Sequence, residues 1–453
     1  MQMDQHSQLQ RFGLFDANVP RYTSYPPATQ FAGGVTPDVY RGWLGEIPAG
    51  SAVSVYVHVP FCRRLCWFCA CRTQGTRTDS PVKAYVETLL QEIESIRAAL
   101  PEGITASRVH WGGGTPTLLP PEDMARLAAA LRAAFPATDG TEISVEIDPN
   151  EIDDPRLDAL AAMGMTRASI GVQDFNPEIQ KIIGREQSYE VTRAAVEGLR
   201  ARGITSLNTD LLYGLPLQTR ARITASLQML LSLNPDRIAL FGYAHVPWMA
   251  KRQSLIPTED LPTPEARLRL FETAQKILTW DGYRQIGIDH FARTGDSLSI
   301  AATEGKLRRN FQGYTDDTSE VLIGLGASSI SRLPQGYAQN ASSTAAYQKA
   351  ARAGELAIAR GHPFSGEDKL RARMIEMLMC NFRIETAGLL EEGVGSLTRI
   401  EALLDNAARA FPGQVERSSE GLSIPSAAQP LARMIARRLD AYESKASGHS
   451  SAI

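Results

Sequence analysis

The residues of this sequence best suited to bind a metal are three closely spaced cysteines, in Cys62-Arg-Arg-Leu-Cys66-Trp-Phe-Cys69. Three thiolates so close together can bind one soft metal centre. Structural zinc usually takes four ligands in two separated pairs, and this chain has no second pair because Cys380 is distant. The loop therefore favours an iron–sulfur cluster in which one iron lacks a protein ligand. Such an iron is free to bind a small molecule.

Two other interpretations of the cysteines have less support. Zinc is the first alternative, with Cys71, His58 or His110 as its fourth ligand. Disulfides are the second, but five cysteines are few for 453 residues and their number is odd. In a reducing compartment, clustered cysteines more often bind metal or act in catalysis than pair.

A glycine-rich stretch, His110-Trp-Gly-Gly-Gly-Thr-Pro-Thr117, follows an expected strand. Glycine lets the backbone approach a ligand closely. The pattern alone is also typical of an ordinary turn, so its weight comes from its position directly after a strand.

Polar or small residues recur near the ends of six expected strands. Active sites of parallel βα barrels form at the carboxyl ends of their strands, so these residues indicate one site built from several loops. They are Tyr56, Gly113, Glu146, Gln173, Asp210 and Tyr243-Ala244.

The elements that must position these residues alternate along the chain. Short β-branched runs follow amphipathic, Ala- and Leu-rich segments, which predicts βα units and a parallel sheet. We expect strands at 54–59, 108–111, 142–147, 167–172, 206–211 and 236–241. We expect helices at 82–100, 121–135, 155–163, 189–202 and 221–233, then a helix at 264–280 and a seventh strand near 283–288.

The predicted fold class is α/β, with a partial (βα)6-type barrel that has fewer units than the eight of a closed barrel. After the barrel, helices are expected at 368–382, 397–411 and 430–442, with a hairpin at 414–424. The predicted segments are an irregular N-terminal arm (1–50), the barrel with extensions (51–360), a mainly helical C-terminal domain (361–444) and a disordered tail (445–453).

Composition narrows the class of protein. Lys and Arg number 47 against 50 Asp and Glu, so a nucleic-acid binder with a basic face is not expected. The polar start MQMDQHSQLQ lacks the apolar stretch of a signal peptide, and no apolar run is long enough to span a membrane. We therefore expect a soluble, cytoplasmic protein, with a monomer as the default.

The C-x3-C-x2-C spacing, with an aromatic residue before the last cysteine, resembles the radical S-adenosylmethionine (SAM) superfamily. The resemblance implies a radical SAM barrel and a 4Fe–4S cluster whose free iron chelates SAM. An electron from the reduced cluster then cleaves SAM to a 5′-deoxyadenosyl radical. The cofactors do this chemistry, while the protein orients them and excludes water and oxygen.

Further motifs resemble one branch of that superfamily, which oxidatively decarboxylates coproporphyrinogen III without oxygen. The likeness runs from about residue 11 to about residue 385 and more weakly to Tyr442. The motifs are Pro20-Arg-Tyr-Thr-Ser-Tyr-Pro26, Tyr56-Val-His-Val-Pro-Phe-Cys62, Cys69-Ala-Cys71, the glycine stretch, Gly171-Val-Gln-Asp-Phe-Asn, Asn208-Thr-Asp-Leu-Leu-Tyr-Gly-Leu-Pro and Arg309-Asn-Phe-Gln-Gly-Tyr.

This narrower resemblance implies residue roles. Cys62, Cys66 and Cys69 would hold the cluster, and Cys71 matches a cysteine that is needed for activity without binding the cluster. Ala70 and Arg72 depart from the branch, whose members tend to have Gly and Asn there. The contacts implied for the cluster-bound SAM are Tyr56, Gly113 and Glu146, and those for a second SAM are Phe68, Gly114, Thr115, Gln173, Arg185, Asp210, Ala244 and Ile330.

The implied reaction turns two of the four propionates of coproporphyrinogen III into vinyl groups, giving protoporphyrinogen IX. Hydrogen abstraction from the β-carbon is followed by loss of CO₂ and one electron, and a flavodoxin- or ferredoxin-type protein would reduce the cluster. An anionic substrate needs cations, and the candidates are Arg21, Arg63, Arg64, Arg72, Arg293, Arg308 and Arg309.

A haem-binding chaperone is the alternative to this enzyme. Paralogues of that kind share the cluster motif and the βα core. They typically lack the Pro-Arg-Tyr-Thr-Ser-Tyr-Pro arm and the cysteine two residues after the third cluster ligand. This chain has both features, in Pro20–Pro26 and at Cys71.

Overall fold

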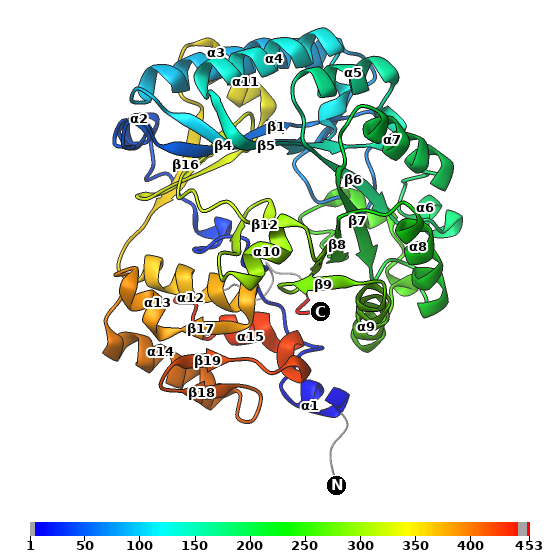
Figure 1. The fold of residues 1–453 in the computed structure, drawn as a ribbon, viewed down its shortest axis with the longest axis vertical. Helices are drawn as coiled ribbons and strands as arrows, with labels where there is room; N and C mark the ends of the chain where they lie inside the picture. Colours follow the sequence, from blue (N-terminus) through cyan, green and yellow to red (C-terminus); the bar gives the residue numbers. More distant parts are fainter. Residues whose placement is uncertain (1–4, 443–450) are drawn as a thin grey trace.

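A curved sheet of 12 strands forms the centre of the computed structural model, which describes residues 5–442 and 451–453. The sheet wraps around a concave side that faces α10 and β12, while the largest helices lie outside (Figure 1). Its strands, in spatial order, are β16 (Ile358–Pro363), β15 (Gly336–Asn340), β14 (Ile330–Leu333), β13 (Leu322–Leu325), β1 (Ala52–Val59), β4 (Thr105–Gly113), β5 (Ala137–Ile147), β6 (Arg167–Gln173), β7 (Ser206–Tyr213), β8 (Arg237–Gly242), β10 (His290–Arg293) and β9 (Tyr283–Ile286).

The six predicted strands are confirmed as β1, β4, β5, β6, β7 and β8, which are neighbours and run parallel. The (βα)6 prediction therefore holds. The predicted seventh strand exists as β9, but it does not extend the parallel run, because it pairs antiparallel with β10, which is itself antiparallel to β8.

Strands β13 to β16 were not predicted. They extend the sheet beyond β1: β13 pairs parallel with β1, and the other three follow antiparallel. They are short and polar in part, so they carry little of the apolar alternation that marks a strand in sequence.

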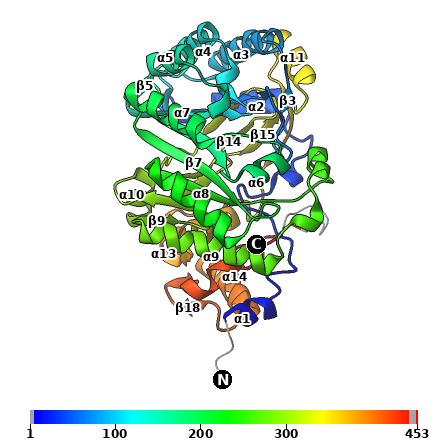
Figure 2. The ribbon, with the colours of Figure 1, turned by 90° about the vertical axis from the view of Figure 1, so that its right-hand side faces the viewer.

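Helices after the parallel strands cover the outer face of the sheet, and Figure 2 shows several of them side by side. Their starts follow local capping signals. Asp153 caps α5 by accepting from Arg156 N, and Ser188 caps α7 in the same way. These covering helices are α3 (Ser80–Ala99), α4 (Pro121–Ala134), α5 (Asp154–Ala162), α6 (Pro177–Ile182), α7 (Tyr189–Ala201), α8 (Arg220–Ser232) and α9 (Pro264–Trp280).

Alternation along the strands separates an apolar outer face from a polar inner face. In β1, Val53, Val55, Val57 and Val59 are buried in the main hydrophobic core. Inward positions of β4 to β7 instead carry polar side chains. The polar rows are Arg108 and His110, Glu142, Ser144 and Glu146, Arg167 and Ser169, and Asn208 and Asp210.

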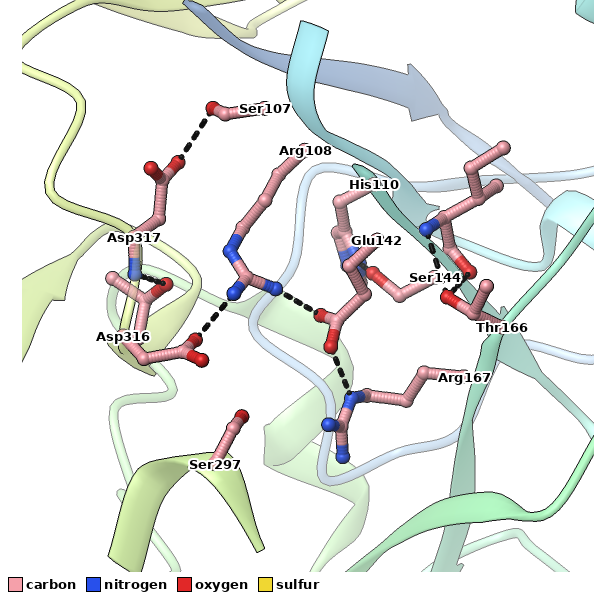
Figure 3. A network of polar contacts seen from close by, with 12 residues as sticks. Ser107, Arg108, His110, Glu142, Ser144, Thr166, Arg167, Ser297, Asp316 and Asp317 are labelled. Carbon is pink, nitrogen blue, oxygen red and sulfur yellow. Dashed lines mark hydrogen bonds and ion pairs between the residues drawn. The ribbon is translucent and has the colours of Figure 1, made fainter. Parts of the chain in front are cut away.

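An ion-pair network joins the inward residues that lie nearest the amino ends of the strands (Figure 3). Arg108 lies between Glu142, at 2.7 Å, and Asp316, at 2.5 Å. Arg167 donates to the other oxygen of Glu142 at 2.9 Å. The two guanidinium groups outweigh the effect of burial and lower the pKa of Glu142 to about 2.

A mainly helical C-terminal unit lies beneath the barrel (Figure 1). The predicted hairpin is confirmed by β18 (Glu416–Ser418) and β19 (Gly421–Ser423). The helix expected at 430–442 is shorter, since α15 ends at Ala436 and is preceded by a 3-10 turn containing Pro430. The other elements are β17 (Arg383–Glu385), α12 (Asp368–Asn381), α13 (Thr386–Glu391) and α14 (Leu397–Ala410).

The N-terminal arm binds this C-terminal unit to the barrel. Tyr22 and Tyr25 are buried in the core of the C-terminal unit, and the Tyr22 hydroxyl donates to Asp440 at 3.0 Å. Arg21 Nη2 donates to Gly242 O at the end of β8, at 2.7 Å. The arm contains α1 (Gln5–Arg11) and α2 (Pro37–Gly45).

Most of the remaining elements lie on the concave side of the sheet or at its rim, whereas α11 packs against α3 on the outside (Figure 1). Most of the predicted tail lies outside the described residues, but Ala452 and Ile453 are buried, and Ala452 N donates to Ala17 O at 2.8 Å. No helix in the described ranges has the length and apolar character of a membrane span. The elements are α10 (Ser297–Thr303), α11 (Thr344–Arg352), β2 (Phe61–Cys62), β3 (Gln74–Gly75), β11 (Arg308–Asn310) and β12 (Gly313–Thr315).

Replacing Glu142 with Gln should destabilise the fold, because it leaves Arg108 and Arg167 without the carboxylate that they share. We expect a loss of about 3 kcal/mol at pH 7, measured by urea denaturation. The carboxylate's pKa is lowered from 4.5 to about 2, so its contribution is complete above pH 4.5 and is lost as the pH falls towards 2.

Glu87 is the matched control, because it also pairs with an arginine, Arg126, but both side chains are exposed. Glu87→Gln should cost less than about 1 kcal/mol. Equal losses in the two variants would show that the network at the amino ends of the strands does not stabilise the barrel.

Candidate active site

Pairing between parallel strands brings the predicted site residues together at one edge of the sheet. Tyr56 pairs with His110, and its ring stacks on the imidazole at a centroid distance of 5.8 Å. Glu146 lies two residues beyond the partner of His110 on β5. On the next strands, Gly171 pairs with Asp210. Residues more than 150 positions apart in sequence therefore share one opening.

The cysteine loop begins in β2, directly after β1, and ends at β3, which pairs parallel with β2 in a separate two-stranded sheet. Cys62, Cys66 and Cys69 are half-buried, whereas Cys71 is exposed. The three spaced cysteines are thus partly covered, whereas Cys71 is accessible.

The glycine stretch packs against this loop. Gly114 N donates to Val59 O, and Thr115 N donates to Phe61 O, each at 2.8 Å. A Cβ on Gly114 would lie 2.5 Å from Phe61 O, so no other residue fits there without moving the backbone. The close approach predicted for the glycines is thus made, at this position, to the chain's own strand.

Gly113 has φ +111°, a conformation that side chains rarely adopt. Its amide donates to Glu146 Oε2 at 3.0 Å. Burial would raise the pKa of Glu146, but hydrogen bonds from His110 and from this amide hold it below its usual value. Glu146 is therefore an anion fixed beside the glycine backbone.

Arg185 connects the cysteine loop to the barrel. Its Nη1 donates to Cys66 Sγ at 3.6 Å and to Asp148 at 3.1 Å, and its Nη2 donates to Gly171 O at 2.9 Å. Burial raises the pKa of the Cys66 thiol, while the Arg185 charge lowers it. A thiolate at this position therefore has a cationic hydrogen-bond donor, which suits a ligand of a soft metal.

The thiols of Cys69 and Cys71 interact directly. Their hydrogen bond lowers the pKa of Cys69 to about 6 and raises the pKa of Cys71. Burial raises the pKa of Cys62 to about 11. No group of three His, Cys, Asp or Glu side chains among the described residues is arranged to hold a single metal ion.

Two residues that the sequence did not single out support the loop from the segment after β8. Gln253 is fully buried, and its amide donates to Phe68 O at 2.7 Å and to Ala244 O at 3.0 Å. Arg252 Nη2 donates to Cys71 O at 3.3 Å. No pattern in the sequence marked them, because both lie in a short 3-10 helix, Lys251–Leu255, which is too short to show the periodicity that predicts an α-helix.

Asp210 and Gln173 face the same opening from β7 and β6. Burial, together with the Glu146 charge, raises the pKa of Asp210 to about 6, although Asn208 Nδ2 donates to it at 2.9 Å. Gln173 has φ +71°, which is strained for a side chain with a Cβ and recurs at functional sites.

Ile330 lies furthest from the other predicted contacts in the sheet. It begins β14, two strands from β1. Its backbone lies against Gly324, which pairs with Tyr56. Ile330 is therefore connected to the opening only through the backbone of the sheet, by way of β13.

Comparisons with known proteins agree with this geometry. A family model described as the radical SAM superfamily matches residues 56–230. The chain is 59% identical over 451 residues to an oxygen-independent coproporphyrinogen III oxidase from Paracoccus denitrificans, with 100% of both chains covered. It is 39% identical to the Escherichia coli protein of the same name, with 93% of each covered.

One solved structure superposes on most of the chain. It is described as coproporphyrinogen III oxidase from Escherichia coli, a radical SAM enzyme. The TM-score is 0.88 at 38% sequence identity, and the match covers 93% of this chain and 98% of that chain. The arm and the C-terminal unit thus belong to the shared architecture.

Replacing Cys66 with Ser should remove the iron–sulfur cluster, because a hydroxyl is a poor ligand for iron in such a cluster. Iron content and visible absorption after anaerobic reconstitution provide the measurement. Cys380→Ser is the control. Cys380 is buried in the C-terminal unit, so this variant should keep all its iron. A full cluster in Cys66→Ser would refute the ligand assignment.

Proposed function

The chain belongs to the family of oxygen-independent coproporphyrinogen III oxidases, and from this membership we propose which of its residues carry the reaction. The enzyme is a radical SAM oxidoreductase of porphyrin biosynthesis. It converts two propionates of coproporphyrinogen III to vinyl groups and forms protoporphyrinogen IX. Identity of 59% over the whole chain is the observation that carries this conclusion.

The family's cofactors are a 4Fe–4S cluster and two molecules of SAM. When bound, they supply the radical that removes a hydrogen atom from the β-carbon of a propionate. In our proposal Cys62, Cys66 and Cys69 hold the cluster. The half-buried thiols and the Arg185 donor at Cys66 suit this role.

We assign the cluster-bound SAM to the opening beside Tyr56, Gly113 and Glu146. SAM carries an amino group and a sulfonium centre, both cationic, so the fixed Glu146 carboxylate offers a complementary charge. The second SAM is assigned to the side of the opening formed by Gln173 and Asp210. The remaining contacts proposed for it are Phe68, Gly114, Thr115, Arg185, Ala244 and Ile330.

Cys71 is proposed to act on the substrate rather than on the cluster. It is exposed, and its thiol lies next to Cys69. The Arg252 contact to its carbonyl fixes the backbone and leaves the thiol accessible.

Membership in the enzyme family does not favour the haem chaperone. The arm and Cys71, which typically distinguish the enzymes from those paralogues, are both present. We further propose a cytoplasmic monomer whose cluster is reduced by a flavodoxin- or ferredoxin-type protein.

Anaerobic incubation with SAM, a strong reductant and coproporphyrinogen III tests the function. Chromatography should detect protoporphyrinogen IX together with 5′-deoxyadenosine. Stable haem binding with a Soret shift, and no product, would instead identify a chaperone.

Replacing Cys71 with Ser should retain the cluster and abolish protoporphyrinogen IX, because the proposed thiol chemistry is lost while the three ligands remain. Iron analysis and product chromatography on the same sample separate the two effects. Loss of iron in this variant would make Cys71 a ligand and would remove the open coordination position.

A further inference from the structure

A cavity of about 350 Å³ lies between the barrel and the C-terminal unit, a size typical of small-molecule pockets. Its walls come from the segment after β8, from α9, from β11 and β12, and from the start of α15. Four arginines from four separate parts of the chain line it, and we call them the arginine cluster. They are Arg21, Arg267, Arg309 and Arg433.

The arginine cluster has a surplus of positive charge. Within the described residues none of the four pairs with an Asp or Glu side chain, although most other arginines of the protein do. Arg267 Nε donates to Ile453 O, an oxygen of the last residue, at 3.1 Å. The acidic residues lining the cavity are Glu272 and Asp289, and Asp289 accepts a hydrogen bond from His290 at 2.7 Å. Burial and the neighbouring charge of Arg21 lower the pKa of Arg433 to about 9.

Backbone carbonyls hold the guanidinium groups in place. Arg267 donates to Tyr243 O at 2.7 Å, and Arg433 donates to Val19 O at 2.6 Å. The main-chain N–H of Arg309 donates a hydrogen bond, and its guanidinium group donates to the Tyr314 hydroxyl. Its Nε is buried without a hydrogen-bond partner. A buried donor without a partner is costly unless a ligand satisfies it.

These features indicate a site for carboxylates, which guanidinium groups bind with strong, directional hydrogen bonds. Two carboxylate sources are available: the propionates of the porphyrinogen and the methionyl carboxylate of the second SAM. Several arginines in one cavity match a substrate with several carboxylates better than a ligand with a single carboxylate. Of the other sequence-predicted candidates, Arg63, Arg293 and Arg308 are already paired with Asp79, Asp281 and Glu376. Arg64 and Arg72 belong to the segment around the cysteines and do not line this cavity.

The cavity is separate from the cysteine loop. Of the predicted SAM contacts only Ala244 is among its described lining residues, and no cysteine of the loop is. A propionate held here would therefore lie outside the set of residues assigned to the cluster-bound SAM, none of which lines the cavity. In protoporphyrinogen IX the two retained propionates are on adjacent rings, so one edge of the macrocycle carries both.

We propose that the arginine cluster binds the two propionates of coproporphyrinogen III that do not react. This inference rests on the proposed function. It makes the cavity an anchor that orients the opposite edge of the macrocycle towards the cluster-bound SAM. The same anchor would also bind the product, which keeps both carboxylates.

The test replaces Arg309 with Gln in the full-length holoenzyme. We expect the KM for coproporphyrinogen III to rise about tenfold or more, as for a lost charge-assisted hydrogen bond, with the KM for SAM unchanged. Arg309→Lys should restore part of the loss, and Arg21→Gln should act in the same direction if the Arg309 variants do not fold. The control is Arg269→Gln, on the exposed face of α9.

Mesoporphyrinogen IX identifies the propionates involved, because it has ethyl groups in place of the reacting propionates and keeps the other two. Its inhibition constant should rise in Arg309→Gln by the same factor as the KM. A raised KM for coproporphyrinogen III with an unchanged inhibition constant would mean that the reacting propionates bind here. A change confined to the KM for SAM would assign the site to SAM. Unchanged values throughout would also overturn the proposal.

Binding of mesoporphyrinogen IX can be measured without turnover. A wild-type protein that binds it through Arg309 but forms no protoporphyrinogen IX would contradict the proposed function and support the anchor. If the wild-type protein forms protoporphyrinogen IX but Arg309→Gln binds mesoporphyrinogen IX equally well, only the anchor is contradicted.

Discussion

The alternation of side chains along parallel strands is the constraint on which this structure depends. Outward positions of β1 carry valines that the helices cover, whereas inward positions of β4 to β7 carry charged and polar side chains. A closed barrel of this width fills its interior with apolar layers. This partial barrel instead holds inward charges in ion pairs, as Glu142 does for Arg108 and Arg167. The inner face of the sheet is therefore polar from this network to the opening where the cofactors are assigned.

The cysteine loop has almost no regular structure of its own, and distant segments hold it. Arg185 reaches it from beyond β6, Gln253 from beyond β8, and the glycine stretch from β4. Apart from the hydrogen bond of Arg185 to Cys66 Sγ, these contacts use backbone carbonyls, so the other cysteine side chains of the loop are not engaged by them. This arrangement explains why the glycines are needed: a Cβ at Gly114 would collide with Phe61 O.

The sequence predicted the six parallel strands and their covering helices because both have strong periodicity and clear caps. It also grouped Tyr56, Glu146 and Asp210, since strand ends meet at one edge. It did not reveal β13 to β16, which are short and weakly alternating, nor Gln253, whose role arises only where the segment after β8 meets the loop. Contacts between segments far apart in sequence leave no local pattern.

The arm and the C-terminal unit acquire a common role from the charge distribution. The net charge of the chain is −3, so the protein as a whole does not attract an anionic substrate. Arg21 from the arm and Arg433 from α15 meet Arg309 and Arg267 only because the arm packs into the core of the C-terminal unit. Since like charges repel, this gathering needs the backbone contacts that fix each guanidinium group. The energy stored in that repulsion is released when a carboxylate binds, which favours a substrate with several carboxylates over a neutral macrocycle.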